Sequence, residues 1–251
     1  MDIDYELTYH KLEEKYWWFK SRRNSIISIL NKMNLPKTSK VLEIGCSGGP
    51  LLQILNEKGY INSIGIDISE NAIKVCNKRG VFNSKVMDAT NLTFKNESFD
   101  IVIASDILEH IENDTLALSE WCRVLKPGGK LVIYVPAYMK LWSHHDEINH
   151  HFRRYQRSDL KTLLSKNNFL IKKISYWNFF LFFPTLIIRK ITQNKKKNIK
   201  INSQLYAINP IVNFFLKTLL HIENWLLKYI EFPFGVSVFA ICEKPQDKKT
   251  S

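Results

Sequence analysis

The sequence predicts an α/β fold in which a mostly parallel, seven-stranded sheet carries helices on both faces. Between Val41 and Val135, short apolar runs alternate with segments of helical periodicity, and turns rich in glycine or proline separate them. Such alternation implies parallel strands joined by right-handed helical crossovers. The 251 residues are enough for one elaborated domain with a full hydrophobic core.

The elements follow one another regularly along the chain. Seven apolar runs are the expected strands, at residues 41–44, 61–66, 85–87, 99–104, 131–135, 170–175 and 236–242. Helices are expected at residues 50–58, 69–78, 114–125 and 158–166. Pro50 suits a first helical turn and Ser69 is a typical N-cap, whereas Gly59 and Gly80 end their helices. Ligands bind at the carboxyl ends of parallel strands, so the residues that follow these strands form the candidate site.

Two segments extend this core. Residues 1–35 form an expected N-terminal helical cap, and residues 36–251 form the main domain, with a helical insertion at residues 176–234 before the last strand. The insertion begins with the aromatic run 176–188, which is shorter than the ~20 residues needed to cross a bilayer as a helix. A second helix is expected at residues 211–230. Its apolar stripe consists of Val212, Phe215, Leu219, Ile222, Leu226 and Ile230.

The positive charge of the chain is concentrated near its C-terminus. Residues 1–159 hold 21 basic and 20 acidic side chains, whereas residues 160–251 hold 15 and 4, an excess of +11. This end is expected to face an anionic lipid layer or a nucleic acid, or else to be a solvated surface. The four cysteines show neither disulfide nor zinc spacing, and the acidic N-terminus does not fit an export signal, so a cytoplasmic protein is expected.

The segment from Val41 to Gly49 gives the strongest functional signal. A strand with an acidic residue leads into a glycine-rich turn, which lets the backbone approach a nucleotide closely. The dinucleotide pattern Gly-x-Gly-x-x-Gly fails at Ser47 and Pro50, which argues against a nicotinamide dehydrogenase. Asp67, 22 positions after Gly45, can accept both ribose hydroxyls of an adenosine ligand. Asp88, after the third strand, can accept an adenine amino group, although alone it is also typical of a turn.

Together with Phe99-Asp100-Ile101-Val102 and Leu108-Glu109-His110, these segments resemble class I S-adenosylmethionine-dependent methyltransferases over residues 40–136. The resemblance implies a Rossmann-like fold and S-adenosylmethionine as cofactor. It implies that the methionine part of the cofactor is surrounded by Glu43, Gly45, Cys46 and Gly49. It also implies that Asp67 binds the ribose, that Asp88 and Ala89 lie at the adenine, and that Ser105 lies near the sulfonium. We also expect Gly48 and Ile68 to contact the cofactor. Ser47 stands where the family usually has glycine, so Gly48 is expected to supply the flexibility of the loop.

The loop from His144 to Tyr155 follows the fifth strand, where acceptor groups lie in this architecture. We expect His145 to be a general base with Asp146 as its orienter, or else the loop to be held together by its own hydrogen bonds. No metal site is expected, because adjacent histidines on one loop rarely converge on one ion. Arg153 and Arg154 suit a phosphate or carboxylate, or pair with Asp146 and Glu147. The expected acceptor residues are His110, His151, Arg153, Arg154 and Tyr155.

The expected function is therefore methyl transfer to a small-molecule, lipid or saccharide acceptor. The Tyr16-Trp17-Trp18-Phe19 and His144 to Tyr155 segments resemble a bacterial and archaeal subgroup of these enzymes, often tied to surface polysaccharide or lipid pathways. A nucleic-acid methyltransferase is disfavoured, since Ser105-Asp106-Ile107-Leu108 replaces an Asn/Asp-Pro-Pro-aromatic motif. A non-catalytic cofactor-binding or membrane-associated scaffold remains the alternative. The aromatic and basic insertion predicts contact with the inner face of an anionic membrane, or packing on the sheet.

Overall fold

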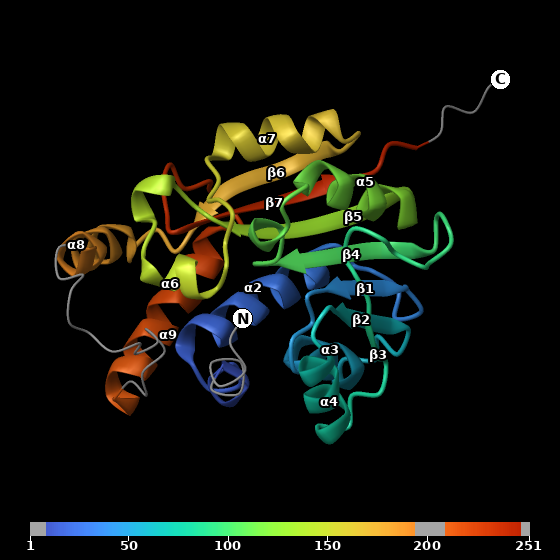
Figure 1. The fold of residues 1–251 in the computed structure, drawn as a ribbon, viewed down its shortest axis with the longest axis horizontal. Coiled ribbons are helices and arrows are strands. Elements are labelled where there is room, and N and C mark those ends of the chain that lie inside the picture. Colours follow the sequence, from blue (N-terminus) through green and yellow to red (C-terminus); the bar gives the residue numbers. More distant parts are fainter. Residues whose placement is uncertain (1–8, 194–208, 247–251) are drawn as a thin grey trace.

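A computed structural model of the chain describes residues 9–193 and 209–246, and in these ranges the strands form one sheet. The strand order is β3-β2-β1-β4-β5-β7-β6, which Figure 1 shows across the molecule. The bounds are β1 (Val41–Ile44), β2 (Ser63–Asp67), β3 (Ser84–Val86), β4 (Phe99–Ser105), β5 (Leu125–Pro136), β6 (Leu170–Trp177) and β7 (Ser237–Glu243). The pairs among β1 to β5 are parallel, and β7 is antiparallel to β5 and β6. The predicted mostly parallel, seven-stranded sheet is confirmed.

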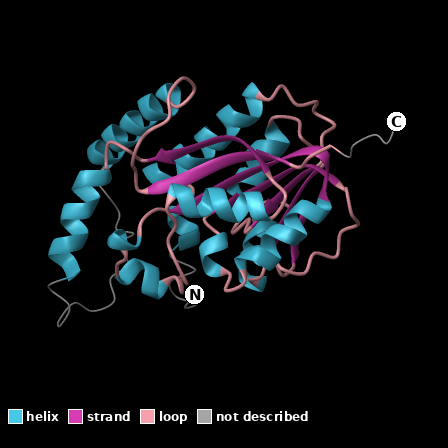
Figure 2. Cartoon of the chain, turned by 90° about the horizontal axis from the view of Figure 1, so that it is seen from above, coloured by secondary structure: helices cyan, strands magenta, loops and turns pink. Residues whose placement is uncertain are grey.

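Helices cover both faces of this sheet, as Figure 2 shows. The helices between strands are α3 (Pro50–Glu57), α4 (Glu70–Lys78), α5 (Asp114–Val124), α6 (His144–Ile148) and α7 (Arg157–Lys166), with short 3-10 turns η1 (Leu108–His110) and η2 (Met139–Leu141). The Ser69 hydroxyl caps α4 by accepting the Ala72 N–H at 3.2 Å. Asn113 caps α5 by accepting the Leu116 N–H at 3.0 Å. Side-chain caps of this kind define where a helix begins.

The strand register places the ends of the central strands at one edge. Ile44 pairs with Ile66 of β2 on one side and with Ala104 of β4 on the other. All four residues of β1 are buried, as expected for a central strand covered on both faces. Gly45, Asp67 and Ser105 therefore lie at neighbouring strand ends.

Two predicted strand boundaries are corrected. β5 begins at Leu125 instead of residue 131, because Phe99 pairs with Leu125 while Ile101 pairs with Lys130, so the Pro-Gly-Gly turn is a bulge within the strand. β6 continues to Trp177, so the insertion does not begin at residue 176. The Trp177 side chain is fully buried, so this part of the aromatic run packs on the protein, which was one of the two expected arrangements.

The predicted insertion between the last two strands contains α8 (Phe182–Gln193) and α9 (Pro210–Leu226). α9 packs on α2 (Trp17–Lys32), where the Asn224 amide donates to the Ser21 carbonyl at 3.0 Å. Its buried face consists of Leu220, Glu223 and Asn224. The predicted apolar stripe points elsewhere, since Val212, Phe215, Ile222 and Ile230 are exposed.

The Glu223 carboxylate joins the two ends of this insertion. It accepts backbone N–H groups from Asn178, Phe179 and Phe180, the last two at 2.9 and 3.3 Å. Lys195 to Lys197, which belong to the basic part of the predicted insertion, lie outside the described residues. No helix in the described ranges has the length and apolar character that a membrane span requires.

Candidate functional site

The glycine turn after β1 is tightly folded. The backbone N–H groups of Gly45 and Cys46 donate to the Ile66 carbonyl at 2.8 and 2.9 Å. Ser47 adopts a left-handed φ of 50°, a conformation that favours glycine, which fits the family preference at this position. Gly48 is not in that region. A Cβ on Gly48 would lie 2.2 Å from Arg79 Nη1 and 2.4 Å from Glu13 Oε1, so the absence of a side chain at Gly48 provides space for these two side chains.

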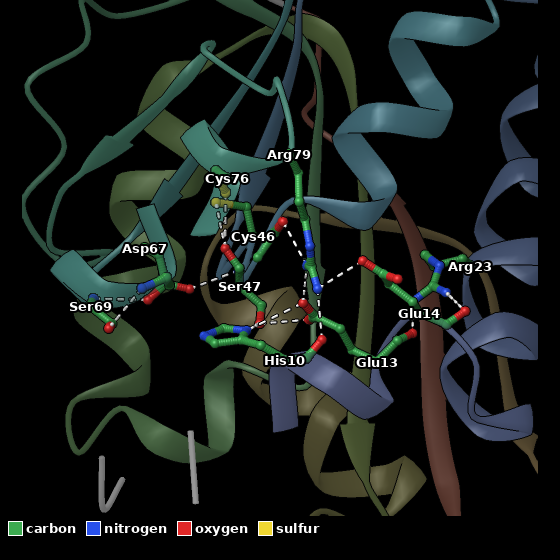
Figure 3. A network of polar contacts seen from close by, with 12 residues as sticks. His10, Glu13, Glu14, Arg23, Cys46, Ser47, Asp67, Ser69, Cys76 and Arg79 are labelled. Atoms are coloured by element: carbon green, nitrogen blue, oxygen red, sulfur yellow. Dashed lines mark hydrogen bonds and ion pairs between the residues drawn. The ribbon is translucent and has the colours of Figure 1, made fainter. Parts of the chain in front are cut away.

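A polar network joins the N-terminal segment to this turn, as Figure 3 shows. The Ser47 hydroxyl donates to Glu13 Oε2 at 2.8 Å. Arg79, directly after α4, forms an ion pair with Glu13 and donates to the carbonyls of Gly48 at 2.9 Å and His10 at 2.7 Å. Burial raises the pKa of Glu13, but hydrogen bonds from His10, Arg79 and Ser47 outweigh it, so the net pKa is lowered. The N-terminal segment thus covers the glycine turn with an ionised carboxylate.

Asp67, the predicted ribose ligand, lies at the end of β2 beside this turn. Its Oδ2 accepts the Ser47 N–H and its Oδ1 accepts the Ser69 N–H, both at 2.9 Å. Both carboxylate oxygens therefore hold the backbone at the strand end where the ribose is predicted to bind. The neighbouring Ile68 side chain is 71% exposed, so it is accessible to a ligand bound beside Asp67.

The other predicted cofactor residues lie at neighbouring strand ends. Glu43 is buried on β1, Cys46 is buried in the glycine turn, and burial raises the pKa of Glu43 well above its ordinary value. Asp88 is exposed and accepts the Thr90 N–H at 2.7 Å, so it also shapes the turn after β3. The Ala89 carbonyl accepts the Trp121 indole N–H at 3.0 Å. The Ser105 hydroxyl donates to Asp106 at 2.9 Å.

A cavity of about 240 Å³, here called the acceptor pocket, lies at the ends of β4 and β5. Its walls include Asp106 directly after β4, Pro136 at the end of β5, and aromatic side chains of the N-terminal segment. Four of the predicted residues line it: His110, His145, His151 and Arg154. In Figure 1, α6 and α8 flank this end of the sheet. The pocket combines aromatic surface with imidazole, carboxylate and guanidinium groups.

Arg153 and Tyr155, also predicted to bind the acceptor, do not line this pocket. Arg153 donates to Asp114 at 2.8 Å and to the Glu112 carbonyl at 2.6 Å. The buried Tyr155 hydroxyl donates to the same Asp114 carboxylate at 3.1 Å. Both side chains therefore fasten the loop to the start of α5, which corrects their predicted role.

Asp146 is the centre of a buried ion network. It is fully buried and accepts hydrogen bonds from the Ser143 N–H at 2.8 Å, Arg154 Nε at 2.7 Å and His151 Nδ1 at 2.9 Å. Burial raises the pKa of Asp146, but His151 and Arg154 outweigh it and hold the pKa far below its usual range. Asp146 thus orients His151, not His145 as predicted, because the capping box of α6 turns its carboxylate inward.

His145 lies half-buried on the pocket wall. Its ring contacts the Asn149 amide, at 3.3 Å from Nδ1. Burial and the nearby Arg189 charge lower the pKa of His145 to about 3, so the ring is neutral at pH 7. Burial and His151 likewise lower the pKa of His110 to about 3.

Arg22, which the sequence reasoning missed, contacts two residues of the pocket wall, Trp18 and Asp106. Its guanidinium is buried among Trp18, Tyr134 and Trp177, with ring centroids at 4.8, 4.1 and 4.2 Å. It lies 3.4 Å from Asp106 and donates to the Ser237 hydroxyl at 2.9 Å. A cation enclosed by three rings gains cation–π stabilisation of about 0.5 to 2 kcal/mol per contact when desolvated. In the sequence, the pattern Tyr16-Trp17-Trp18-Phe19-x-x-Arg22 could have pointed to this contact between a cation and aromatic rings.

Comparison with known proteins supports the resemblance found in the sequence. Residues 42–133 match a family described as "Methyltransferase domain". Phosphoethanolamine N-methyltransferase of Plasmodium falciparum is 28% identical over 193 residues, which cover 70% of this chain and 71% of that protein. Phosphoethanolamine N-methyltransferase 1 of Arabidopsis thaliana is 33% identical over 109 residues. That match covers 41% of this chain but only 22% of the plant protein.

A solved structure extends the match to nearly the whole fold. The S-adenosylmethionine-dependent methyltransferase from Archaeoglobus fulgidus is 26% identical, with a TM-score of 0.57, and the match covers 94% of this chain and 99% of that chain. The structural likeness therefore extends well beyond residues 42–133.

Proposed function

Because this chain carries a class I S-adenosylmethionine-dependent methyltransferase domain, we propose that it methylates a small-molecule, lipid or saccharide acceptor. One observation carries the proposal: the acceptor pocket opens at the ends of β4 and β5, at the same sheet edge as the glycine turn. The two phosphoethanolamine methyltransferases are named for a small acceptor, which supports this class.

The cofactor is proposed to lie along the ends of β1 to β4. Gly45, Cys46, Gly48 and Gly49 would border its methionine part, Asp67 and Ile68 its ribose, Asp88 and Ala89 its adenine, with Glu43 and Ser105 nearby. The sulfonium loses its charge as its methyl group moves in line to the acceptor, so the protein mainly aligns the reactants and excludes water. The buried aromatic walls of the pocket suit that task. His145 is the proposed proton acceptor for a hydroxyl or amine; its lowered pKa keeps the ring unprotonated but makes it a weak base, so it holds the proton only transiently.

Asp67→Ala is expected to weaken binding of S-adenosylmethionine and of its demethylated product by about 1 to 3 kcal/mol, the range for leaving buried hydroxyls unpaired. Calorimetry measures both affinities. Glu70→Ala is the matched control, because it removes the same charge from an exposed position three residues away. The proposal fails if the folded wild-type protein binds neither compound but binds NAD, and Asp67 loses its role if the two variants bind alike.

We further propose that the exposed apolar surface of α8 and α9 contacts an anionic membrane. Phe183, Ile187 and Ile191 are exposed on α8, and Phe214, Phe215 and Trp225 are exposed on α9. Exposed Lys190 and Lys217 accompany them, and a basic side chain near an anionic surface contributes about 1 kcal/mol. α8 also supplies Thr185 and Arg189 to the acceptor pocket, so a membrane-bound acceptor could reach the pocket along this helix.

Vesicle flotation tests this surface. The protein is expected to float with phosphatidylglycerol-containing vesicles, less so at high salt, because screening weakens exposed charges. Phe215→Glu should reduce flotation several-fold, whereas Phe82→Glu should not, since Phe82 is even more exposed but precedes β3. Absence of flotation with any vesicle composition would refute membrane contact and leave methyl transfer untouched.

A further inference from the structure

Three side chains from two separate loops meet in the wall of the acceptor pocket. Glu109 and His110 lie on η1 after β4, and His151 follows α6. One potential ligand atom from each residue lies within 4.8 Å of the others. The rings of His110 and His151 meet edge to face, with centroids 4.5 Å apart. Only His151 belongs to the histidine-rich loop, so the sequence spacing gave no sign of this cluster.

Glu109 lacks a partner for one of its buried oxygens. Its side chain is 1% exposed, and Oε2 has no hydrogen bond among the described residues. Buried polar groups in folded proteins almost always have partners, because an unpaired one keeps the full cost of desolvation. A carboxylate in this position points to a cation that completes its coordination.

His151 is oriented as a metal ligand is. Its Nδ1 lies 2.9 Å from Asp146 Oδ1, and Arg154 holds the same oxygen at 2.7 Å. Because the ionised carboxylate accepts a hydrogen bond from the Nδ1–H group, the lone pair of the neutral His151 ring is on Nε2. A carboxylate behind an imidazole in this way is the usual second shell of histidine ligands in metal sites.

We propose that Glu109, His110 and His151 bind one divalent transition-metal ion, with a coordination position open to the acceptor. Two imidazole nitrogens and one carboxylate oxygen suit Zn²⁺, Fe²⁺ or Mn²⁺, and three protein ligands with an open position are typical of catalytic zinc sites. Ligand atoms around tetrahedral Zn²⁺ are about 3.4 Å apart, given bonds of about 2.1 Å. Displacements of about 1 Å in the side chains would bring the three ligand atoms from within 4.8 Å of one another to that spacing.

The ion selects an oxygen acceptor, an inference that rests on the proposed methyl transfer. A hydroxyl bound at the open position becomes more acidic, because the metal stabilises the oxyanion. The proton leaves to His145 or to water, and the oxyanion attacks the methyl carbon. The O–C bond forms as the S–C bond breaks, and the electron pair of that bond stays on sulfur, which becomes a neutral thioether. Phosphate or carboxylate oxygens on the acceptor would add ligands to the same ion.

Zinc titration of the chelator-treated full-length protein, without methyl donor or acceptor, tests the site directly. One equivalent of Zn²⁺ is expected to bind, and Glu109→Gln and His151→Ala should each weaken binding by at least about 100-fold. His144→Ala is the matched control, because this exposed histidine pairs with Glu147 outside the pocket. The visible spectrum of the Co²⁺ form should report nitrogen and oxygen ligands, and Glu109→Gln should abolish it. Circular dichroism checks that each variant is folded.

The outcomes separate this site from the proposed function. Zinc binding that all three variants share, or a folded wild-type protein that binds no Zn²⁺ or Co²⁺, would overturn the metal site. Calorimetry with S-adenosylmethionine then decides the cofactor proposal independently. If a methylation assay is established, full activity of Glu109→Gln in excess chelator would also overturn the metal site while confirming methyl transfer.

Discussion

Asp146→Asn is expected to lower the free energy of unfolding by about 3 to 5 kcal/mol, the cost of leaving a buried ion pair without one partner. Asp146 is fully buried and pairs with Arg154 at 2.7 Å, while Arg189 lies 3.6 Å from its other oxygen. The amide keeps the shape of the side chain but removes its charge, so two nearly buried guanidinium groups lose their counterion. Urea unfolding at pH 7 measures the difference.

The same carboxylate should give the protein a specific acid sensitivity. Its pKa is lowered in the folded state, so its stabilisation is fully present above the unfolded pKa of about 3.9. It is lost progressively as the pH falls from about 5 toward the folded pKa. The difference in the free energy of unfolding between wild type and Asp146→Asn should therefore become smaller in acid. Asp88→Asn, at an exposed position, is the control and should change stability little. If wild type and Asp146→Asn are equally stable at pH 7, the ion network around Asp146 does not stabilise the folded protein.

His145→Ala is expected to reduce turnover by about 100-fold or more, the usual contribution of a positioned general base, with cofactor affinity nearly unchanged. The reason is its position: His145 lines the acceptor pocket, whereas the predicted cofactor contacts lie at the ends of β1 to β4. Turnover is measured as transfer of labelled methyl groups to polar-metabolite and lipid extracts of the producing cells. Calorimetry gives the cofactor affinity of the same variant.

Two results would remove this role from His145. Activity within a few-fold of wild type means that the reaction needs only alignment. Loss of folding means that the contact between His145 and Asn149 is structural. His144→Ala provides the comparison, because its ring is on the same helix but 55% exposed and paired with Glu147. It should retain both activity and stability.

The sequence by itself determined the sheet and the glycine turn, since both depend on local patterns. Buried parallel strands read as short apolar runs, and Val41–Ile44 followed by glycines is such a run. Ser69 capping and the helix that begins at Pro50 depend on neighbours within one turn. The prediction that Asp67 lies at the end of β2 is confirmed, because the length of the strand and the position of the following turn determine where the strand ends.

Only the tertiary structure decided which side chains meet at the site. Glu13 reaches Ser47 and Arg79 across 34 and 66 positions, and Glu109 meets His151 from another loop. Asp146 contacts His151 and Arg154 because the capping box of α6 turns the Asp146 carboxylate inward. The stripe on α9 had a clear helical period, but a period does not say which face is covered. Here the Asn224 amide donates to Ser21 on α2 and Glu223 accepts the Asn178 N–H, so the face with Leu220, Glu223 and Asn224 is buried and Phe215 is exposed.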